Sequence, residues 1–325
     1  MHSIKSIFKY NSFMQNFSQT PMIQIIPFLE TQLKKLSSKE SISFKVLNPD
    51  YSSSTYNGNS VIIDLHEYIY RGYKTWLDLA QQFQCRMLTP LMVDEYFVII
   101  KYEKLNSDVS FHKQSADKEE KYGKDSIFSL IHKNEEAAYL YYYLQALKNV
   151  KIDTRVRILN LGINSGDEFQ AIIEVAEDFE SLELVGIDYC SSAIESAQEK
   201  FKEYTNIKFI QADINELEKL ALEKFDLIIS IGTLQSSNLE FNKLLMSLVQ
   251  NQLKRSGAMI LGFPNCRWID GEMVYGARVK NYAFSEMGLL YKDVIFSKKY
   301  LQQKKFRVTI TGKDYVFLTG TSIVK

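Results

Sequence analysis

The sequence has few of the features that mark several large protein classes. It contains three cysteines, Cys85, Cys190 and Cys266, with no C-x-x-C spacing, which argues against a disulfide framework or a structural zinc site and for a reducing compartment. No apolar run approaches the roughly 18 residues of a membrane span, and the first residues lack the apolar core of a signal peptide. We therefore expect a cytoplasmic protein with no membrane partner.

An excess of charge of either sign is also lacking. The 325 residues include 39 Lys and Arg and 39 Asp and Glu, so a globally basic nucleic-acid binder is not indicated. The balance is uneven, with net charges of +2 over 1–155, −10 over 156–253 and +8 over 254–325. This asymmetry fits either solvated helix faces or a basic tail that faces an anionic substrate. Nucleic acid as a partner of the basic C-terminal segment stays open but is not favoured.

A polar stretch divides the chain. Residues 106–125 are rich in charged residues and poor in periodic apolar ones, which is typical of a linker. Residues 1–105 predict a small α+β domain, for which we expect a role in substrate recognition. Its helical patterns cover 22–36 and 73–83, and its strand patterns cover 41–47, 60–65 and 95–105.

Residues 126–325 predict an α/β domain that opens with a long helical pattern over 126–150. Alternating strands and helices imply right-handed crossovers and a parallel sheet. The strand patterns lie at 155–162, 182–188, 207–213, 224–232 and 257–264, followed by an antiparallel hairpin at 306–312 and 314–324. The expected fold is a doubly wound, mostly parallel seven-stranded sheet with an antiparallel C-terminal hairpin, plus the smaller N-terminal α+β domain.

The strongest motif, ILNLGINSG, joins the first of these strands to a helix. Glycine permits positive φ and close approach of a ligand, and the helix N-terminus favours an anionic group. The dinucleotide fingerprint G-x-G-x-x-G fails at Asn164 and Asp167. The G-x-G-x-G loop of S-adenosylmethionine sites, with Gly162 and Gly166, fails only at Asn164, a residue type that tolerates left-handed conformations.

Polar residues end the next three strands. At the second, the Asp188 carboxylate can accept both hydroxyls of a ribose. At the third, Asp213 can accept a hydrogen bond from an adenine amino group, and the Ile214 N–H can reach a ring nitrogen. Ser230 and Ile231 end the fourth strand. All lie where open α/β sheets bind ligands, at the carboxyl ends of parallel strands.

Each of these residues also has a purely structural interpretation. The glycines permit a tight turn, Asp188 caps the helix predicted over 191–204, and Asp213 caps the short helix that follows it. Ser191 and Ser192 are further candidates for the N-cap of the helix over 191–204. A sheet domain without a ligand would not need all these residues together.

Taken together, the motifs resemble those of class I S-adenosylmethionine-dependent methyltransferases. The resemblance covers 155–325 and rests on NLGINSG, VGIDY, QADI, FDLIIS and the final antiparallel hairpin. It implies a Rossmann-like fold, S-adenosyl-L-methionine as cofactor, S-adenosyl-L-homocysteine as product, and a small-molecule, RNA or protein acceptor. The cofactor-binding residues it implies are Asn160, Gly162, Ile163, Asn164, Gly166, Asp188, Tyr189, Asp213, Ile214, Ser230 and Ile231.

Two positions depart from the family's pattern. Asn160 stands where an acidic residue is expected, and Asn164 replaces the middle glycine. These departures support an alternative, a non-catalytic module that holds the cofactor or a partner. A nicotinamide-dependent oxidoreductase is disfavoured because the third glycine of its fingerprint is absent.

No motif identifies the acceptor or a catalytic residue. The sequence after the fourth strand, SIGTLQSS, lacks the Asn/Asp-Pro-Pro-aromatic motif of enzymes that methylate base amines or glutamine amides. In the family the segment equivalent to 265–300 commonly covers the substrate, and its interleaved basic and aromatic residues fit a nucleic acid or a small anionic aromatic compound. Its substrate-facing candidates are Asn265, Arg267 and Trp268, whereas Cys266 is interpreted as a structural thiol. No metal site is expected, because the histidines are scattered.

Overall fold

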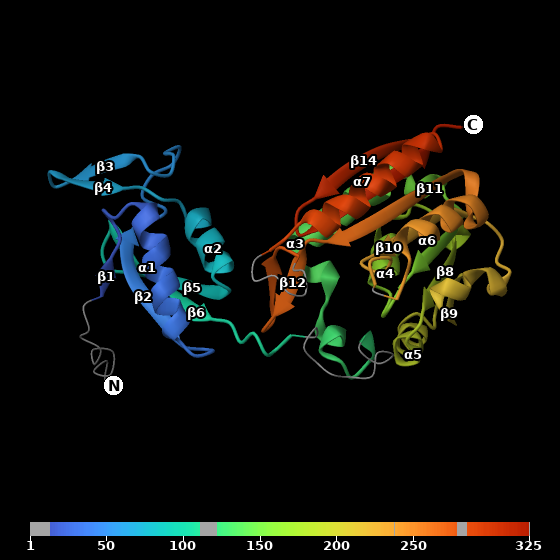
Figure 1. Cartoon of the computed structure of the whole chain (residues 1–325), viewed down its shortest axis with the longest axis horizontal. Coiled ribbons are helices and arrows are strands. Elements are labelled where there is room, and N and C mark those ends of the chain that lie inside the picture. Colours follow the sequence, from blue (N-terminus) through green and yellow to red (C-terminus); the bar gives the residue numbers. More distant parts are fainter. Residues whose placement is uncertain (1–13, 111–121, 237, 278–284, 325) are drawn as a thin grey trace. The chain divides into compact units, whose positions relative to one another are not determined.

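The computed structural model describes residues 14–110, 122–236, 238–277 and 285–324, and it divides into two compact units (Figure 1). The first unit comprises Met1–Val109 together with Trp268–Val274, and the second comprises Ser110–Arg267 and Tyr275–Lys325. A short piece of the predicted 265–300 insertion therefore groups with the N-terminal unit. Among the described residues, no helix has both the length and the apolar character needed to cross a membrane.

The N-terminal unit is built on a four-stranded sheet in the order β1-β2-β6-β5. These strands are β1 (Gln15–Asn16), β2 (Ser41–Leu47), β5 (Cys85–Met92) and β6 (Phe97–Lys104). The helices α1 (Met22–Lys35) and α2 (Tyr73–Gln82) cover one face, because Leu29 and Trp76 share a buried cluster with Phe44 and Ile100 of the sheet. The strand predicted over 60–65 is instead a hairpin of β3 (Ser60–Ile63) and β4 (His66–Ile69).

The second unit contains a seven-stranded sheet in the order β14-β15-β11-β10-β7-β8-β9. The strands are β7 (Arg157–Leu161), β8 (Glu183–Asp188), β9 (Ile207–Gln211), β10 (Phe225–Ile231), β11 (Leu253–Pro264), β14 (Phe306–Gly312) and β15 (Tyr315–Ser322). Pairing is parallel from β11 to β9, whereas β15 runs antiparallel to both β11 and β14. The predicted fold class is confirmed. The central strands β7 and β10 are buried on both faces, which explains their continuous apolar sequences.

Helices and short helical turns connect these strands. They are η2 (Ile127–Leu130), η3 (Lys133–Glu135), α3 (Ala137–Asn149), η4 (Ile152–Thr154), α4 (Asp167–Val175), η5 (Phe179–Ser181), α5 (Ser191–Lys200), η6 (Ile214–Leu220), α6 (Phe241–Ser247), η7 (Leu248–Gln252) and α7 (Gly288–Gln303).

The long helix predicted over 126–150 is wrong in its first part, because the α-helix begins only at Ala137. Before it lie two 3₁₀ turns, and side chains of the second, η3, bond to α4. Lys133 pairs with Glu168, and the Asn134 amide donates to the Asp167 carbonyl. These tertiary bonds override the helical spacing of the sequence.

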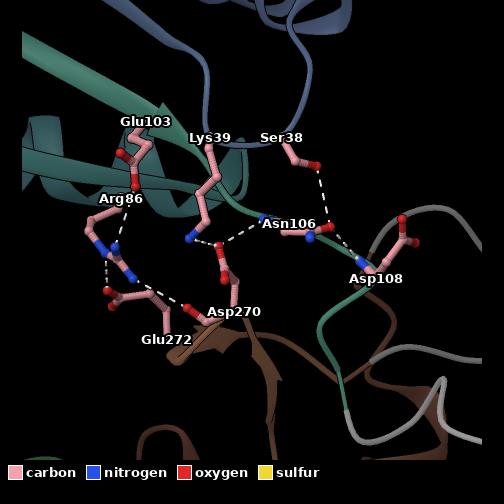
Figure 2. A network of polar contacts seen from close by, with 8 residues as sticks. All are labelled: Ser38, Lys39, Arg86, Glu103, Asn106, Asp108, Asp270 and Glu272. Carbon is pink, nitrogen blue, oxygen red and sulfur yellow. Dashed lines mark hydrogen bonds and ion pairs between the residues drawn. The ribbon is translucent and has the colours of Figure 1, made fainter.

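A second hairpin, β12 (Cys266–Ile269) and β13 (Glu272–Tyr275), has its tip in the N-terminal unit. Figure 2 shows how this tip is bound. Asp270 Oδ2 lies 2.5 Å from Lys39 Nζ and accepts a hydrogen bond from the Asn106 N–H at 3.0 Å. Arg86 Nε donates a hydrogen bond to Glu272 at 2.6 Å. Ile269 and Val274 also form a buried cluster with Leu105. Polar and apolar contacts together therefore anchor the tip.

Candidate functional site

The loop between β7 and α4 adopts left-handed conformations at its three key positions. The φ angles are 75° at Gly162, 48° at Asn164 and 87° at Gly166. A Cβ added at Gly162 would lie 1.9 Å from Thr233 Oγ1, and one at Gly166 would lie 2.3 Å from Phe201 Cε2. Positive φ and close packing therefore both require glycine at these two positions, while asparagine provides the conformation at the middle one.

Asp188 at the end of β8 holds this loop in place. Its Oδ2 accepts a hydrogen bond from the Asn164 N–H at 2.9 Å, and its Oδ1 accepts one from the Cys190 N–H at 3.0 Å. Burial raises the pKa of the Asp188 carboxyl, against the opposing effect of these hydrogen bonds and of the charge of Lys133. The Tyr189 backbone N–H also bonds to this carboxyl. A carboxylate has about four acceptor positions, so these three bonds leave capacity for a ligand hydroxyl.

The structure corrects the two cap assignments at the start of α5. The N-cap residue is Cys190, not Ser191 or Ser192, and no side chain caps the helix. Asp188 bonds the N–H of the N-cap residue itself, so it is not the N-cap. The structural role of Asp188 is to join the glycine loop to the segment that leads into α5.

The other strand-end residues lie at the same edge of the sheet, because β7, β8, β9 and β10 are parallel. Asp213 is the N-cap of η6 and accepts a hydrogen bond from the Asn215 N–H at 2.8 Å, so its structural interpretation is observed. Ser230 is buried and donates to the Leu161 carbonyl at 3.3 Å. Ile163, Ile214 and Ile231 are buried, whereas Tyr189 is exposed.

Asn160, in the middle of the sheet, has a side chain that is buried without hydrogen bonds. It is 1% exposed, and neither its Oδ1 nor its Nδ2 has a partner among the described residues. An unpaired buried amide costs on the order of 1–3 kcal/mol, so such groups need an explanation. A ligand that supplies the missing partners would provide one.

A buried ion pair beside the loop was not anticipated from the sequence. Lys133 Nζ lies 2.7 Å from Glu168 Oε1, and their side chains are 9% and 1% exposed. Burial alone would lower the pKa of Lys133, but the charges of Glu168 and Asp167 raise it. Glu168 Oε2 has no hydrogen-bond partner in the described part of the chain. Sequence offered only a weak signal, an acidic residue in the first turn of a helix.

Residues preceding α3 also contact the loop. The Tyr122 carbonyl accepts a hydrogen bond from Asn164 Nδ2 at 2.7 Å, and the Lys124 N–H donates to Ser192 Oγ at 3.0 Å. Together with the bonds of Lys133 and Asn134 to α4, these contacts tie the segment to the loop and to both neighbouring helices. The side chain of Asn164, absent from a glycine, provides one of these ties.

The three substrate-facing candidates are divided between the two units. Asn265 is buried in the second unit, where its N–H donates to the Asp314 carbonyl at 2.7 Å and its own carbonyl accepts from the Gly276 N–H. Arg267 also belongs to the second unit, whereas Trp268 belongs to the first. Both are partly buried. No cluster of three His, Cys, Asp or Glu side chains that could hold a metal occurs in the described ranges.

Comparison with known families identifies this domain. A family model described as "Methyltransferase domain" matches residues 152–308, which include the glycine loop, the strand-end residues and the sheet from β7 to β11. Residues 152–308 form a class I S-adenosylmethionine-dependent methyltransferase domain. The family resemblance expected from the sequence is thereby confirmed.

The methyltransferase domain also has distant sequence relatives. The carboxy-S-adenosyl-L-methionine synthase of Helicobacter pylori (strain HPAG1) is 26% identical over 157 residues, which cover 47% of this chain and 63% of that protein. The protein of the same name from strain Shi470 is 27% identical over 157 residues, with the same coverage. The chain thus matches less than two thirds of the length of these curated relatives.

Solved structures similar to the chain include other methyltransferases. The CurJ carbon methyltransferase is 15% identical with a TM-score of 0.42, covering 63% of this chain and 57% of that one. The N-methyltransferase NodS from Bradyrhizobium japonicum WM9 is 16% identical with a TM-score of 0.40, covering 58% of this chain and 98% of that one.

Proposed function

We propose that the methyltransferase domain of this chain binds S-adenosylmethionine and transfers its methyl group to an acceptor. The observation that carries the proposal is the arrangement around Asp188, whose carboxylate holds the left-handed glycine loop through Asn164 at the carboxyl edge of the sheet. The unpaired amide of Asn160 in the same strand supports it, because a bound cofactor would offer that amide hydrogen-bond partners.

The residues present fit the cofactor as follows. Asp188 accepts the ribose hydroxyls, Asp213 and the Ile214 N–H bind the adenine, and Asn160 and the loop bind the methionine end. The remaining residues of the proposed site are Gly162, Ile163, Asn164, Gly166, Tyr189, Ser230 and Ile231. When bound, S-adenosylmethionine supplies a methyl group already activated by the sulfonium. The protein then contributes mainly proximity and orientation.

For the acceptor, the proposal names residues that face it but no specific compound. Asn265 and Arg267 of the second unit face the acceptor, and the N-terminal unit serves in substrate recognition. Residues 278–284 of the predicted insertion over 265–300 lie outside the described residues. Burial, with the charges of Asp314 and Glu136, raises the pKa of Cys266 to about 12. This supports a structural thiol and not a nucleophile.

The cytoplasm is the proposed compartment, in keeping with three buried free cysteines.

A second candidate follows from the names of the curated relatives. As carboxy-S-adenosyl-L-methionine synthases, they make a modified form of the cofactor. The test is incubation of the full chain with S-adenosylmethionine and a pool of metabolites, followed by mass spectrometry. S-adenosylhomocysteine together with a methylated product supports methyl transfer, and carboxylated S-adenosylmethionine supports the second candidate. Cofactor binding without either product would support the non-catalytic alternative.

A further inference from the structure

The turn between β14 and β15 places a carboxylate at the same edge of the sheet as the glycine loop. Because β7, β10 and β11 are parallel, Pro264 at the end of β11 lies at this edge, and it pairs with Tyr315 at the start of β15. The preceding residue, Asp314, accepts the hydrogen bond of the Asn265 N–H through its backbone carbonyl. Asp314 therefore adjoins Asn265, which is proposed to face the acceptor.

Asp314 is unusual for a residue of a hairpin turn, because it is 2% exposed, whereas turns normally face water. The turn depends on Gly312, which has a φ of 122° and where an added Cβ would lie 1.9 Å from the Tyr315 carbonyl oxygen. In this turn the Asp314 side chain is held away from solvent.

The Asp314 carboxylate is poorly compensated. Its Oδ1 is buried and has no hydrogen-bond partner among the residues that the structure describes. Its Oδ2 lies 3.4 Å from Lys313 Nζ, but the Lys313 side chain is 61% exposed, and such a pair contributes little. A buried carboxylate without donors is costly, so its retention at this edge indicates a ligand that supplies a donor.

Nearby groups add negative charge. The carboxylates of Asp314 and Glu136 both act on the Cys266 thiol, and the Tyr315 side chain bonds to it. All four residues belong to the second unit. A positively charged donor is therefore favoured over a neutral hydroxyl, since a charge-assisted hydrogen bond is roughly twice as strong as a neutral one.

We propose that Asp314 binds the methyl acceptor, and that this acceptor is an amine which presents an N–H to Oδ1. The inference rests on the proposed methyl transfer and names its substrate class. Asp314 takes one proton from the bound ammonium. The freed lone pair forms the C–N bond while the C–S bond breaks and its electron pair stays on sulfur. The product leaves as a methylated ammonium, and Asp314 returns its proton to water.

The test compares the full chain with Asp314→Asn, Asp314→Ala and the control Lys313→Ala, which alters the exposed neighbour in the same turn. Benzylamine and n-butylamine are titrated calorimetrically against the protein with and without S-adenosylhomocysteine, beside benzyl alcohol and n-butanol. We expect the amines to bind the wild type and the control, and to bind both Asp314 variants about 10- to 100-fold more weakly. Affinity for S-adenosylhomocysteine should change less than about twofold.

A stability measurement separates binding from a structural role. Asp314→Asn should keep or raise the urea midpoint, because it removes a poorly compensated buried charge, whereas loss of a structural residue would lower it. Any one of three results would overturn the proposal. These are equal affinity of the amines for wild type and Asp314→Asn, binding of the alcohols as tightly as the amines, and no binding of the amines at all. Failure to bind S-adenosylhomocysteine would instead refute the proposed methyl transfer, and the titrations without cofactor still report on Asp314.

Discussion

The Asp188 carboxylate accepts a hydrogen bond from the backbone N–H of Asn164 at 2.9 Å, which joins the end of β8 to the middle of the glycine loop. Its second oxygen accepts from the Cys190 N–H and fixes the approach to α5. One side chain thus orders both segments between which we propose that a ribose binds. Its replacement should affect the fold and the cofactor affinity together.

Asp188→Ala should weaken S-adenosylhomocysteine binding about 30- to 1000-fold, because two charge-assisted hydrogen bonds to the ribose are lost. It should also lower the free energy of unfolding by about 1–3 kcal/mol, since the backbone N–H groups of Asn164, Tyr189 and Cys190 lose their acceptor. Asp188→Asn should lose less affinity, because its amide oxygen still accepts. Calorimetric titration and urea unfolding measure the two effects, with exposed Asp178→Ala as the control. Wild-type affinity in Asp188→Ala would remove this residue from the site.

Gly162→Ala should destabilise the protein more than Gly58→Ala. Both positions have positive φ, but an added Cβ meets Thr233 at Gly162 and nothing within 4 Å at Gly58. Each substitution costs about 1–2 kcal/mol for the left-handed conformation, and overpacking adds about 1–3 kcal/mol only at Gly162. Urea unfolding of both variants provides the comparison. Equal losses of unfolding free energy in the two variants would contradict this prediction, because they would show that Thr233 moves away from the added Cβ at no energetic cost.

Much of the fold was predictable because burial on both faces makes β7 and β10 continuous apolar runs between helical patterns. The edge strand β5 was missed, since its sequence does not alternate and Pro90 lies within a register shift between Leu88 and Leu91. The 3₁₀ turn η3 before α3 was missed because its Lys133 bonds to Glu168 of α4. Local sequence does not contain such contacts.

The same limit applies to the site. The glycine loop and the strand-end residues follow from motif spacing and sheet topology. The burial of Asp314 does not, because a turn sequence such as Gly312-Lys313-Asp314 normally indicates an exposed carboxylate. Nor could the sequence indicate that Trp268–Val274 joins the N-terminal unit, since Asp270 meets Lys39 across more than 200 residues of sequence.

Lys133→Met should cost about 3–5 kcal/mol of folding free energy, because it leaves the buried Glu168 carboxylate without its counter-charge. The double variant Lys133→Met with Glu168→Gln should recover most of this loss. Lys202→Met, which breaks an exposed pair with Glu199, should cost less than about 1 kcal/mol. The free energies of unfolding are measured in urea for the wild type, the two single variants and the double variant. If Lys133→Met loses no more folding free energy than Lys202→Met, the buried pair of Lys133 and Glu168 does not stabilise the fold as expected.

The hairpin tip should loosen in acid. Burial alone would raise the pKa of Asp270, but hydrogen bonds from the Asn106 N–H and from Lys39 lower it below its ordinary value. A carboxyl with a lowered pKa stabilises the fold above its unfolded pKa of about 3.9. That contribution is lost as the pH falls through the folded value.

Hydrogen exchange over β12 and β13, corrected for intrinsic rates, should therefore show protection that declines below about pH 4 in the wild type. Asp270→Asn should show weaker protection at neutral pH and a smaller decline. Glu30→Gln, in an exposed pair with Lys34 on α1, should behave as the wild type. Parallel declines in wild type and Asp270→Asn would exclude Asp270 as the group responsible.

Calorimetric titration of the wild-type chain with S-adenosylhomocysteine, beside an identical titration with NADH, tests the central claim most directly. We expect one site for S-adenosylhomocysteine, no binding of NADH, and a stabilisation of about 2.7 kcal/mol at 100 times the Kd. Binding of NADH in the absence of S-adenosylhomocysteine binding would contradict the claim that this domain uses S-adenosylmethionine.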